Sequence, residues 1–580
     1  MTNKNDGLSA ACELIKNGNM FSYDYLPLAA AYCRRLGLVE LVNRMVPSEM
    51  ELSPGLAVQS MVLDTLSGRT PLYRLEEFME TQDTDLLLGE KVPSRLFNDN
   101  NLARSLDALF EAGSSKILTE VGIRAAENFS LDATRVNYDT TSRNVWGAYY
   151  GSEDESRKGP AIVHGKSKDK RPDLKQFMTE LLCVERGIPI FGRTLDGNSS
   201  DKTSNNKILS RISSIMAKHG LGTGAFVYVA DAAMVTRKNL ECVGDNLFIS
   251  RFPANFSACG NLIRDAVESD NWTELGQLAE NPGPAGKPSA SYKICDKPFE
   301  LYGKEYRGIV VHSDAYDKRR MKKLDRNLKD SEKELRKQLK SISSVYFCEA
   351  DAKQAAGKAE KLYAPLHHVE VEICPFEARG PGRPPENRPA KTRTKYELKW
   401  EIKEKKEVVE KKKTEAGCFV LISNTPIEGD NSMSGRKILK VYKGQYGIES
   451  DFAFLKDPIV VNDIFLKKPH RIDALGMILV IALMIWRLME RVMRAWVGNT
   501  GKTLPGWEKR RTYKPTSFMV STAIYNIQGI VLEGGGRCLI RKPNRRAEEY
   551  LQALGLDENV FTDCHFKCKP IIPQKNTSKG

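Results

Sequence analysis

The 580-residue sequence predicts an α/β protein built on a mixed sheet, with a helical N-terminal domain and a β-rich insertion. Three observations predict the sheet. Leu131–Asp139 alternates in part between apolar and polar residues, as a half-buried strand does. Residues 177–184 and 188–195 flank a short turn and predict a hairpin. The continuous apolar run 225–230 predicts a strand buried on both faces.

Residues 1–125 predict a helical accessory domain. Apolar residues recur at helical spacing in 25–46 and 55–66, and prolines interrupt the pattern further along. The arginines of this region are spread out and form no stripe. We therefore expect an accessory domain, with DNA binding as one role that it could serve.

Residues 126–245 predict the first part of a catalytic core, because two predicted strands end in an aspartate. The first ends at Asp139, which Thr140-Thr141 follow, and the second ends at Asp231. Two strands of one sheet can place such carboxylates close together. Three antiparallel strands, the amphipathic helix 205–218 and a further strand follow the order of the RNase H-like nuclease fold. Asp132 is a weaker candidate for the first position, since it lacks the following Thr-Thr.

A dense basic loop, residues 164–173, separates the first predicted strand from the hairpin. Its side chains Lys168, Lys170 and Arg171 are candidate contacts to a DNA backbone, because cations in such a loop can pair with phosphates.

Residues 246–430 predict a β-rich insertion with one charged helix. Strands are expected at 248–250, 306–313, 369–373, 396–403 and 418–423. In the helix 317–342, apolar residues at spacings of three, four or seven predict that one side packs. Packing in a coiled hairpin and a basic face directed at DNA are the two alternatives.

The segment 379–414 is strongly basic, with thirteen Lys or Arg against six Glu. It begins with Arg-Gly-Pro-Gly-Arg-Pro-Pro at 379–385, which predicts an extended linker. A solvated loop is the usual structure of such a run, and contact with a DNA backbone is the alternative.

The stretch 442–456 contains a carboxylate where a buried face is expected. If 438–456 is one helix, six residues share a face within an arc of about 80°. They are Ile438, Tyr442, Gln445, Glu449, Phe452 and Lys456. A carboxylate on an inward face must be paired, neutralised or bound to a metal. Glu449 is therefore a candidate metal ligand, with an ion-paired or solvent-reaching glutamate as the alternative.

Residues 431–500 predict the second part of the core, and 501–580 a basic C-terminal region with a short helical part and a mobile end. The longest apolar run, 474–486, is too short for a bilayer, which needs about twenty residues. A buried core helix is expected there instead. The N-terminus leads into no apolar signal region, so no membrane association is expected.

Cysteine usage and net charge limit the compartment and the partner. The twelve cysteines form no Cys-x-x-Cys pair, which favours a reduced, cytosolic protein. Cys564-His565-Phe566-Lys567-Cys568 resembles a metal motif, but no second ligand pair has zinc-finger spacing. The formal charge of +14 suits a polyanion, nucleic acid first and an anionic membrane second.

With Asp139, Asp231 and Glu449 taken together, the chain resembles bacterial insertion-sequence transposases of the DDE class. The closest branch carries a Tyr-x2-Arg-x3-Glu-x6-Lys signature, which Tyr442, Glu449 and Lys456 match at full spacing. The resemblance also rests on Tyr138–Thr141, Lys168–Leu174, Gly197–Asp201 and Val229–Asp231, and runs from about residue 30 to about 550. Asp231 and Glu449 are 218 positions apart, which fits the family's β-rich insertion.

The resemblance implies metal-dependent cleavage and transfer of DNA strands. Two Mg²⁺ ions, about 3.5–4 Å apart, would serve both ends of an in-line displacement, and Mn²⁺ can substitute. Asp139 would bridge both ions, and Asp231 and Glu449 would each bind one. Tyr442 and Lys456 would contact DNA near the cleaved end, Lys456 through phosphate.

One signature position departs from the family, because Gln445 stands where the arginine is expected. Glutamine can donate a hydrogen bond to phosphate but brings no charge, so Gln445 remains a candidate DNA contact.

The function expected from the resemblance is binding of inverted-repeat DNA ends, cleavage, and joining of the 3′-hydroxyl to target DNA. A homodimer acting on two double-stranded ends and a cytoplasmic, nucleoid-associated location in a prokaryote are implied with it. The alternatives are an RNase H-like nuclease without strand transfer and a catalytically inactive DNA-binding relative.

Overall fold

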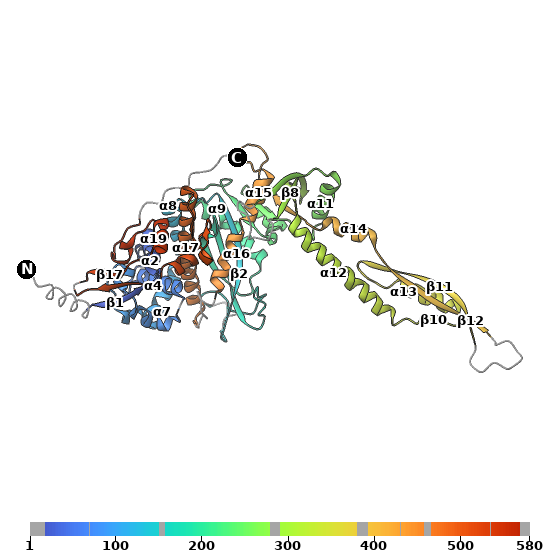
Figure 1. Ribbon diagram of the computed structural model, residues 1–580, viewed down its shortest axis with the longest axis horizontal. Helices are drawn as coiled ribbons and strands as arrows, with labels where there is room; N and C mark the ends of the chain where they lie inside the picture. Colours follow the sequence, from blue (N-terminus) through green and yellow to red (C-terminus); the bar gives the residue numbers. More distant parts are fainter. Residues whose placement is uncertain are drawn as a thin grey trace, which may run out of the picture. The chain divides into compact units, whose positions relative to one another are not determined.

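The computed structural model describes eight stretches of the chain (Figure 1). They are residues 18–68, 70–149, 157–278, 290–379, 392–429, 431–457, 466–533 and 535–568. The chain divides into two compact units. The first unit comprises Met1–Ser250, Glu428–Asn431 and Lys440–Gly580, and the second comprises Arg251–Ile427 and Ser432–Leu439.

The first unit contains a mixed sheet in the strand order β4-β3-β2-β5-β6. Its strands are β2 (Arg135–Val145), β3 (Lys175–Val184), β4 (Ile188–Leu195), β5 (Val227–Ala230) and β6 (Leu247–Arg251). The first three are antiparallel neighbours, β5 runs parallel to β2, and β6 runs parallel to β5. Helices α9 (Asp201–Lys218) and α10 (Arg237–Val243) precede the two parallel strands. The predicted hairpin, helix and buried strand are confirmed.

Strand β2 differs from its prediction at both ends. It begins at Arg135 and continues past Asp139 to Val145, so Asp139 lies within the strand and not at its end. The reason is the partner strand β3, which pairs with β2 along its whole length. Thr140 and Thr141, predicted to follow the end of the strand, are instead part of it and are buried in the sheet, as is Ser142. Threonine is a favourable strand residue because its β-branched side chain packs well on a pleated surface.

Helix α17 (Pro469–Thr500) is the central helix of the first unit. It packs against β4 and against α2, α4, α7, α8 and α19, and Figure 1 shows it among these helices. Every residue from 474 to 490 is buried. Among the described residues it is the one helix long and apolar enough to cross a bilayer, but 89% of its most apolar window is buried within the protein. The prediction of a buried core helix is confirmed.

The N-terminal part of the first unit is helical, as predicted, with one strand added. The main helices are α2 (Leu26–Leu36), α3 (Leu38–Met45), α4 (Pro54–Ser67), α7 (Asp99–Ala112) and α8 (Ser114–Phe129). Strand β1 (Asn19–Tyr23) pairs with β16 (Ile527–Val531), which pairs in turn with β17 (Arg537–Arg541). This small sheet joins two segments that lie about 500 residues apart in the sequence. The C-terminal region also contains α18 (Ser517–Ala523) and α19 (Arg545–Leu554).

The second unit contains four antiparallel strands in the order β13-β9-β8-β7. They are β13 (Cys418–Ser423), β9 (Lys304–Ser313), β8 (Ser291–Leu301) and β7 (Thr273–Gln277). Helix α11 (Ser257–Ser269) contacts β13, β9 and β8. Strands β9 and β13 were predicted, whereas β7, β8 and α11 were not.

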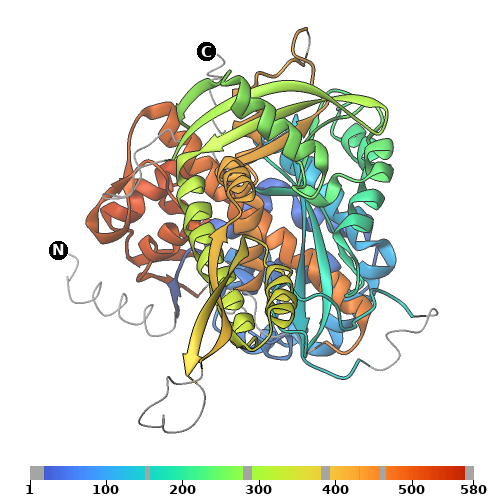
Figure 2. The same ribbon diagram turned by 90° about the vertical axis from the view of Figure 1, so that its right-hand side faces the viewer.

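A long helix leads from these strands to a β-hairpin. Helix α12 (Asp314–Leu339) has 26 residues, which corresponds to about 39 Å. The hairpin consists of β11 (His367–Arg379) and β12 (Thr392–Glu404), with the short β10 (Val345–Tyr346) beside β12. Helix α13 (Glu349–Glu360) lies against the hairpin (Figures 1 and 2).

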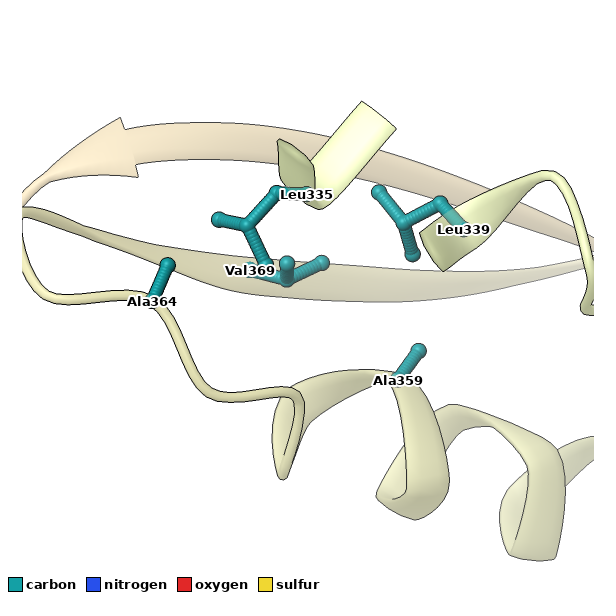
Figure 3. Close-up of a cluster of buried hydrophobic side chains, with 5 residues drawn as sticks. All are labelled: Leu335, Leu339, Ala359, Ala364 and Val369. Atoms are coloured by element: carbon teal, nitrogen blue, oxygen red, sulfur yellow. The ribbon is translucent and has the colours of Figure 1, made fainter. Parts of the chain in front are cut away.

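The apolar side of α12 packs against this hairpin. Leu335 and Leu339 are buried with Val369 of β11, Ala359 of α13 and Ala364, and Figure 3 shows the five side chains directed toward one another. A second cluster joins three alanines of α13 to Leu398 of β12. The expectation that one side of α12 packs is confirmed, but its partner is a β-hairpin and not a second coiled helix.

The basic segment 379–414 is mostly not a loop. Thr392–Glu404 forms β12, and Lys406–Glu415 forms helix α14. The cross-strand pairing of β12 with all of β11 explains the strand. Most of the linker predicted at 379–385 lies outside the described residues.

A candidate carboxylate site on the mixed sheet

Two of the predicted site residues, Asp139 and Asp231, come from neighbouring parallel strands. Asn137 of β2 is paired with Val229 of β5, so the register two positions further brings Asp139 level with Asp231. Asp231 also begins a short 3-10 turn, where its side chain accepts a hydrogen bond from the Ala233 N–H at 3.0 Å. The fold therefore brings these two residues together, as the sequence predicts.

The two carboxylates share one electrostatic environment. Burial raises the pKa of Asp139 to about 6; Lys168 opposes the rise, whereas Asp231 and Asp201 add to it. Burial also raises the pKa of Asp231, where the Ala233 N–H and Lys168 oppose the rise and Asp201 adds to it. Carboxylates that lie close together disfavour one another's ionisation. A cation bound among them would favour the ionised forms.

Asp201, the first residue of α9, is a third carboxylate beside this pair. Its Oδ1 accepts a hydrogen bond from Thr140 Oγ1 at 2.5 Å and lies 3.3 Å from Lys168 Nζ. Gly197–Asp201 contributes to the family resemblance, but no sequence pattern singled out Asp201 as a site residue. The available signal was its place at the start of a helix that directly follows β4, since such a position is near a sheet edge.

Lys168 and its neighbour Asp169 connect the basic loop to the site. Lys168 Nζ lies 3.9 Å from Asp139 Oδ1, and its backbone N–H donates to Ser142 Oγ at 2.8 Å. Asp169 Oδ1 lies 2.5 Å from Nζ of Lys456, the last residue of α16 (Tyr446–Lys456). Two residues predicted to contact DNA are thus held by carboxylates of the chain itself.

Glu449, the third predicted ligand, is not gathered with the two aspartates. It is exposed on α16, a helix that contacts β2 and α17 and that Figure 1 shows beside β2. Among the described residues, no group of three His, Cys, Asp or Glu is arranged to hold a metal ion.

The single helical face predicted for 438–456 is wrong. The chain turns at Gly444-Gln445, between α15 (Gly435–Lys443) and α16, so Tyr442 and Glu449 lie on different helices. Gly447 allows the first turn of α16 to lie close to the turn between β3 and β4. A Cβ on this residue would lie 2.6 Å from the Arg186 carbonyl carbon, so the close approach to the β3–β4 turn requires glycine.

The carboxylate that α16 does bury is Asp451, which the sequence patterns did not single out. Arg487 of α17 donates from Nε to Asp451 Oδ1 at 2.6 Å and from Nη1 to Glu490 at 3.2 Å. Burial raises the pKa of Asp451, and the bond from Arg487 opposes that rise. The pairing demanded of an inward carboxylate is thus met at Asp451.

Arg171 and Lys170 follow Lys168 in the basic loop, and Asp132 lies before β2. Arg171 pairs with Asp173 at 2.6 Å and stacks 5.3 Å from the centre of the Trp146 ring, and Lys170 is exposed. Asp132, the weaker candidate, precedes β2 and accepts the Thr134 N–H at 3.0 Å in an exposed turn. Its position outside the sheet favours Asp139.

Asp139 and Asp231 fit a divalent cation by donor type. Carboxylate oxygens are hard ligands that Mg²⁺ and Mn²⁺ prefer, and the two residues come from rigid neighbouring strands. The Lys168 ammonium already lies among oxygens at this place, which indicates that the site attracts positive charge.

Comparison with known proteins covers only the N-terminal helices. The model of a domain of unknown function, DUF4277, matches residues 19–123, which extend from β1 into α8. No curated protein matches the chain. None of the residues of the carboxylate site lies within the matched region.

Proposed function

We propose that this protein is a DNA transposase of the DDE class. It would bind the inverted-repeat ends of a mobile element, cleave them and join the 3′-hydroxyl to target DNA. The observation that carries the proposal is the placement of Asp139 on β2 and of Asp231 directly after the neighbouring parallel strand β5, where burial and the nearby Asp201 carboxylate raise the pKa of both residues.

The topology of the first unit supports an RNase H-like core. Three antiparallel strands are followed by a helix, a strand parallel to the first, a second helix and a further parallel strand. In this order the first and fourth strands are neighbours, which is what brings the two aspartates together.

The residues would divide the work as follows. Asp139 and Asp231 would hold a divalent cation, and Glu449, which lies apart from them on α16, would complete the ligand set. Bound Mg²⁺ would activate the attacking oxygen and stabilise the leaving oxygen of the phosphodiester. Lys456, Lys168, Lys170 and Arg171 would hold phosphate groups, with Tyr442 and Gln445 beside them.

A catalytically inactive DNA-binding relative is the second candidate. Two observations favour it: Glu449 is exposed and apart from the aspartates, and Gln445 replaces the signature arginine. Either function would place the protein on the nucleoid of a prokaryotic cell, as a dimer on two DNA ends.

A joining assay separates these functions. Purified protein would be incubated with labelled duplexes taken from both flanks of its gene, an unlabelled target plasmid, and Mg²⁺ or EDTA. We expect Mg²⁺-dependent cleavage and joining that fall to background in Asp139→Asn, Asp231→Asn and Glu449→Gln. Asp132→Asn is the matched control, since it makes the same change in an exposed turn outside the sheet.

The other outcomes are equally informative. Cleavage without joining would indicate a nuclease, and binding of the ends without cleavage would indicate the inactive relative. Strand joining that survives Glu449→Gln would remove that residue from the mechanism.

A further inference from the structure

Lys168 and Asp169 are consecutive residues of the basic loop, and each forms an ion pair with a residue of opposite charge. The two ion pairs lie on the two elements that carry candidate ligands, β2 and α16. Lys168 reaches the side of β2 that holds Asp139, and Asp169 reaches Lys456 at the end of α16. Both pairs belong to the first unit. One dipeptide therefore spans the strand of the first predicted ligand and the helix of the third.

Several oxygens surround the Lys168 ammonium, as they would surround a bound metal ion. Its Nζ donates to the Thr140 carbonyl at 2.5 Å and to Thr140 Oγ1 at 3.1 Å. Asp201 Oδ1 lies at 3.3 Å and Asp139 Oδ1 at 3.9 Å. Two of these four oxygens come from carboxylates, and Asp139 is the residue expected to bind both ions.

Asp169 is bound as a phosphate would be. One of its oxygens lies 2.5 Å from Lys456 Nζ, and both side chains are partly shielded, with exposed fractions of 32% and 25%. An anionic oxygen at this distance from an ammonium is the contact that a DNA phosphate makes with lysine. Asn144 Nδ2 also donates to Asp169 at 3.4 Å, which anchors the loop to β2.

We propose that Lys168-Asp169 is an internal substitute for the cation and the phosphate, and that it closes the site until both ligands displace it. The inference rests on the proposed function. Because the two residues are adjacent in one loop, a movement that frees Asp139 from Lys168 also draws Asp169 away from Lys456. Divalent cation and DNA would therefore each favour the open loop and strengthen the binding of the other.

The substitution Asp169→Asn tests this coupling, because two explanations give opposite signs. Removal of a negative charge near a cation site weakens cation binding if only electrostatics operates. If the loop closes the site, the same substitution loosens it and tightens cation binding. From the free energy of a partly exposed ion pair, we expect Mn²⁺ affinity to rise about threefold to fivefold.

Mn²⁺ alone would be titrated into the full chain, with free Mn²⁺ measured by electron paramagnetic resonance. Affinity for a fluorescein-labelled 20-base-pair duplex would be measured separately by anisotropy without metal, and it should also rise in Asp169→Asn. Asp173→Asn is the matched control, since it removes the same charge from the same loop but pairs with Arg171. It should leave Mn²⁺ affinity unchanged or slightly weaker.

Lys168→Met provides a second variant and should also raise Mn²⁺ affinity. If the wild type binds Mn²⁺ and DNA but neither variant tightens Mn²⁺ binding, the internal substitute is wrong while the proposed function stands. If the wild type binds neither ligand, both are wrong. Circular dichroism of each variant would verify that it is folded.

Discussion

Two long helices of similar length, α17 in the first unit and α12 in the second, have opposite relations to solvent. In α17, with 32 residues, every position from 474 to 490 is buried. In α12, with 26 residues, the buried side chains among those described from 321 to 339 are Leu324, Ser331, Leu335 and Leu339. Length and helical periodicity therefore do not predict whether a helix is buried. The number of apolar positions around its circumference does.

Ion pairs on the two helices also differ in their exposure to solvent. Arg487 of α17 pairs with Asp451 in the interior, where the side chains are 10% and 0% exposed. Arg336 of α12 pairs with Glu332 at the surface, where they are 66% and 41% exposed. An interior charge that loses its partner stays desolvated, whereas a surface charge is solvated by water. Loss of the buried ion pair should therefore reduce stability more than loss of the exposed one.

The largest effect should come from Asp451→Ala. The substitution leaves Arg487 buried beside Glu490 without its closest carboxylate, and we expect the free energy of unfolding to fall by about 3–5 kcal/mol. Urea denaturation followed by circular dichroism measures the change, and hydrogen exchange in peptides from α16 and α17 locates it. Glu332→Ala on α12 is the control and should cost less than about 1 kcal/mol. Equal losses in the two variants would break the comparison.

The apolar side of α12 should tolerate truncation according to burial. Leu335→Ala removes a fully buried side chain from the cluster with Val369 and Ala359, and should cost about 2–5 kcal/mol. Hydrogen exchange should increase in α12, α13 and the β11–β12 hairpin, and stay unchanged in α17. Leu328→Ala, at a half-buried position of the same helix, should have a clearly smaller effect. Increased exchange in α17 would show that the hairpin cluster is not a local unit.

The smallest effect concerns the pH dependence of cation binding at Asp139. The pKa of Asp139 is raised to about 6, so its folded form binds a proton more tightly than an unfolded aspartate does. A protonated carboxyl cannot bind cation. Mn²⁺ affinity should therefore fall by about tenfold for each pH unit below 6 and level off above 7.

Electron paramagnetic resonance titrations of Mn²⁺ between pH 5 and pH 8 would measure this profile. Asp139→Asn should abolish most of the binding and its pH dependence. Glu370→Gln, on the hairpin of the second unit, should leave the profile unchanged, because Lys403 holds the pKa of that exposed acid low. A midpoint near pH 4 in the wild type would contradict the raised pKa.

Local sequence patterns were sufficient where neighbours in the chain are also neighbours in space. The hairpin of β3 and β4, strand β13 and the position of Asp231 after a buried strand follow from alternation, apolar runs and turn residues. Asp201 was missed because its contacts to Thr140 and Lys168 come from other elements. Strand β1 was missed because its partner, β16, lies about 500 residues further along the chain.

The sequence by itself determined the α/β class, the burial of α17 and the pair of aspartates, because each depends on side-chain periodicity or on the order of strands. Only the tertiary structure decided which carboxylate of α16 faces inward. The turn at Gly444-Gln445 resets the helix phase, and Arg487, which lies 36 residues beyond Asp451, supplies the partner. A helical period assigns residues to faces, but the face that is buried depends on which distant elements pack against it.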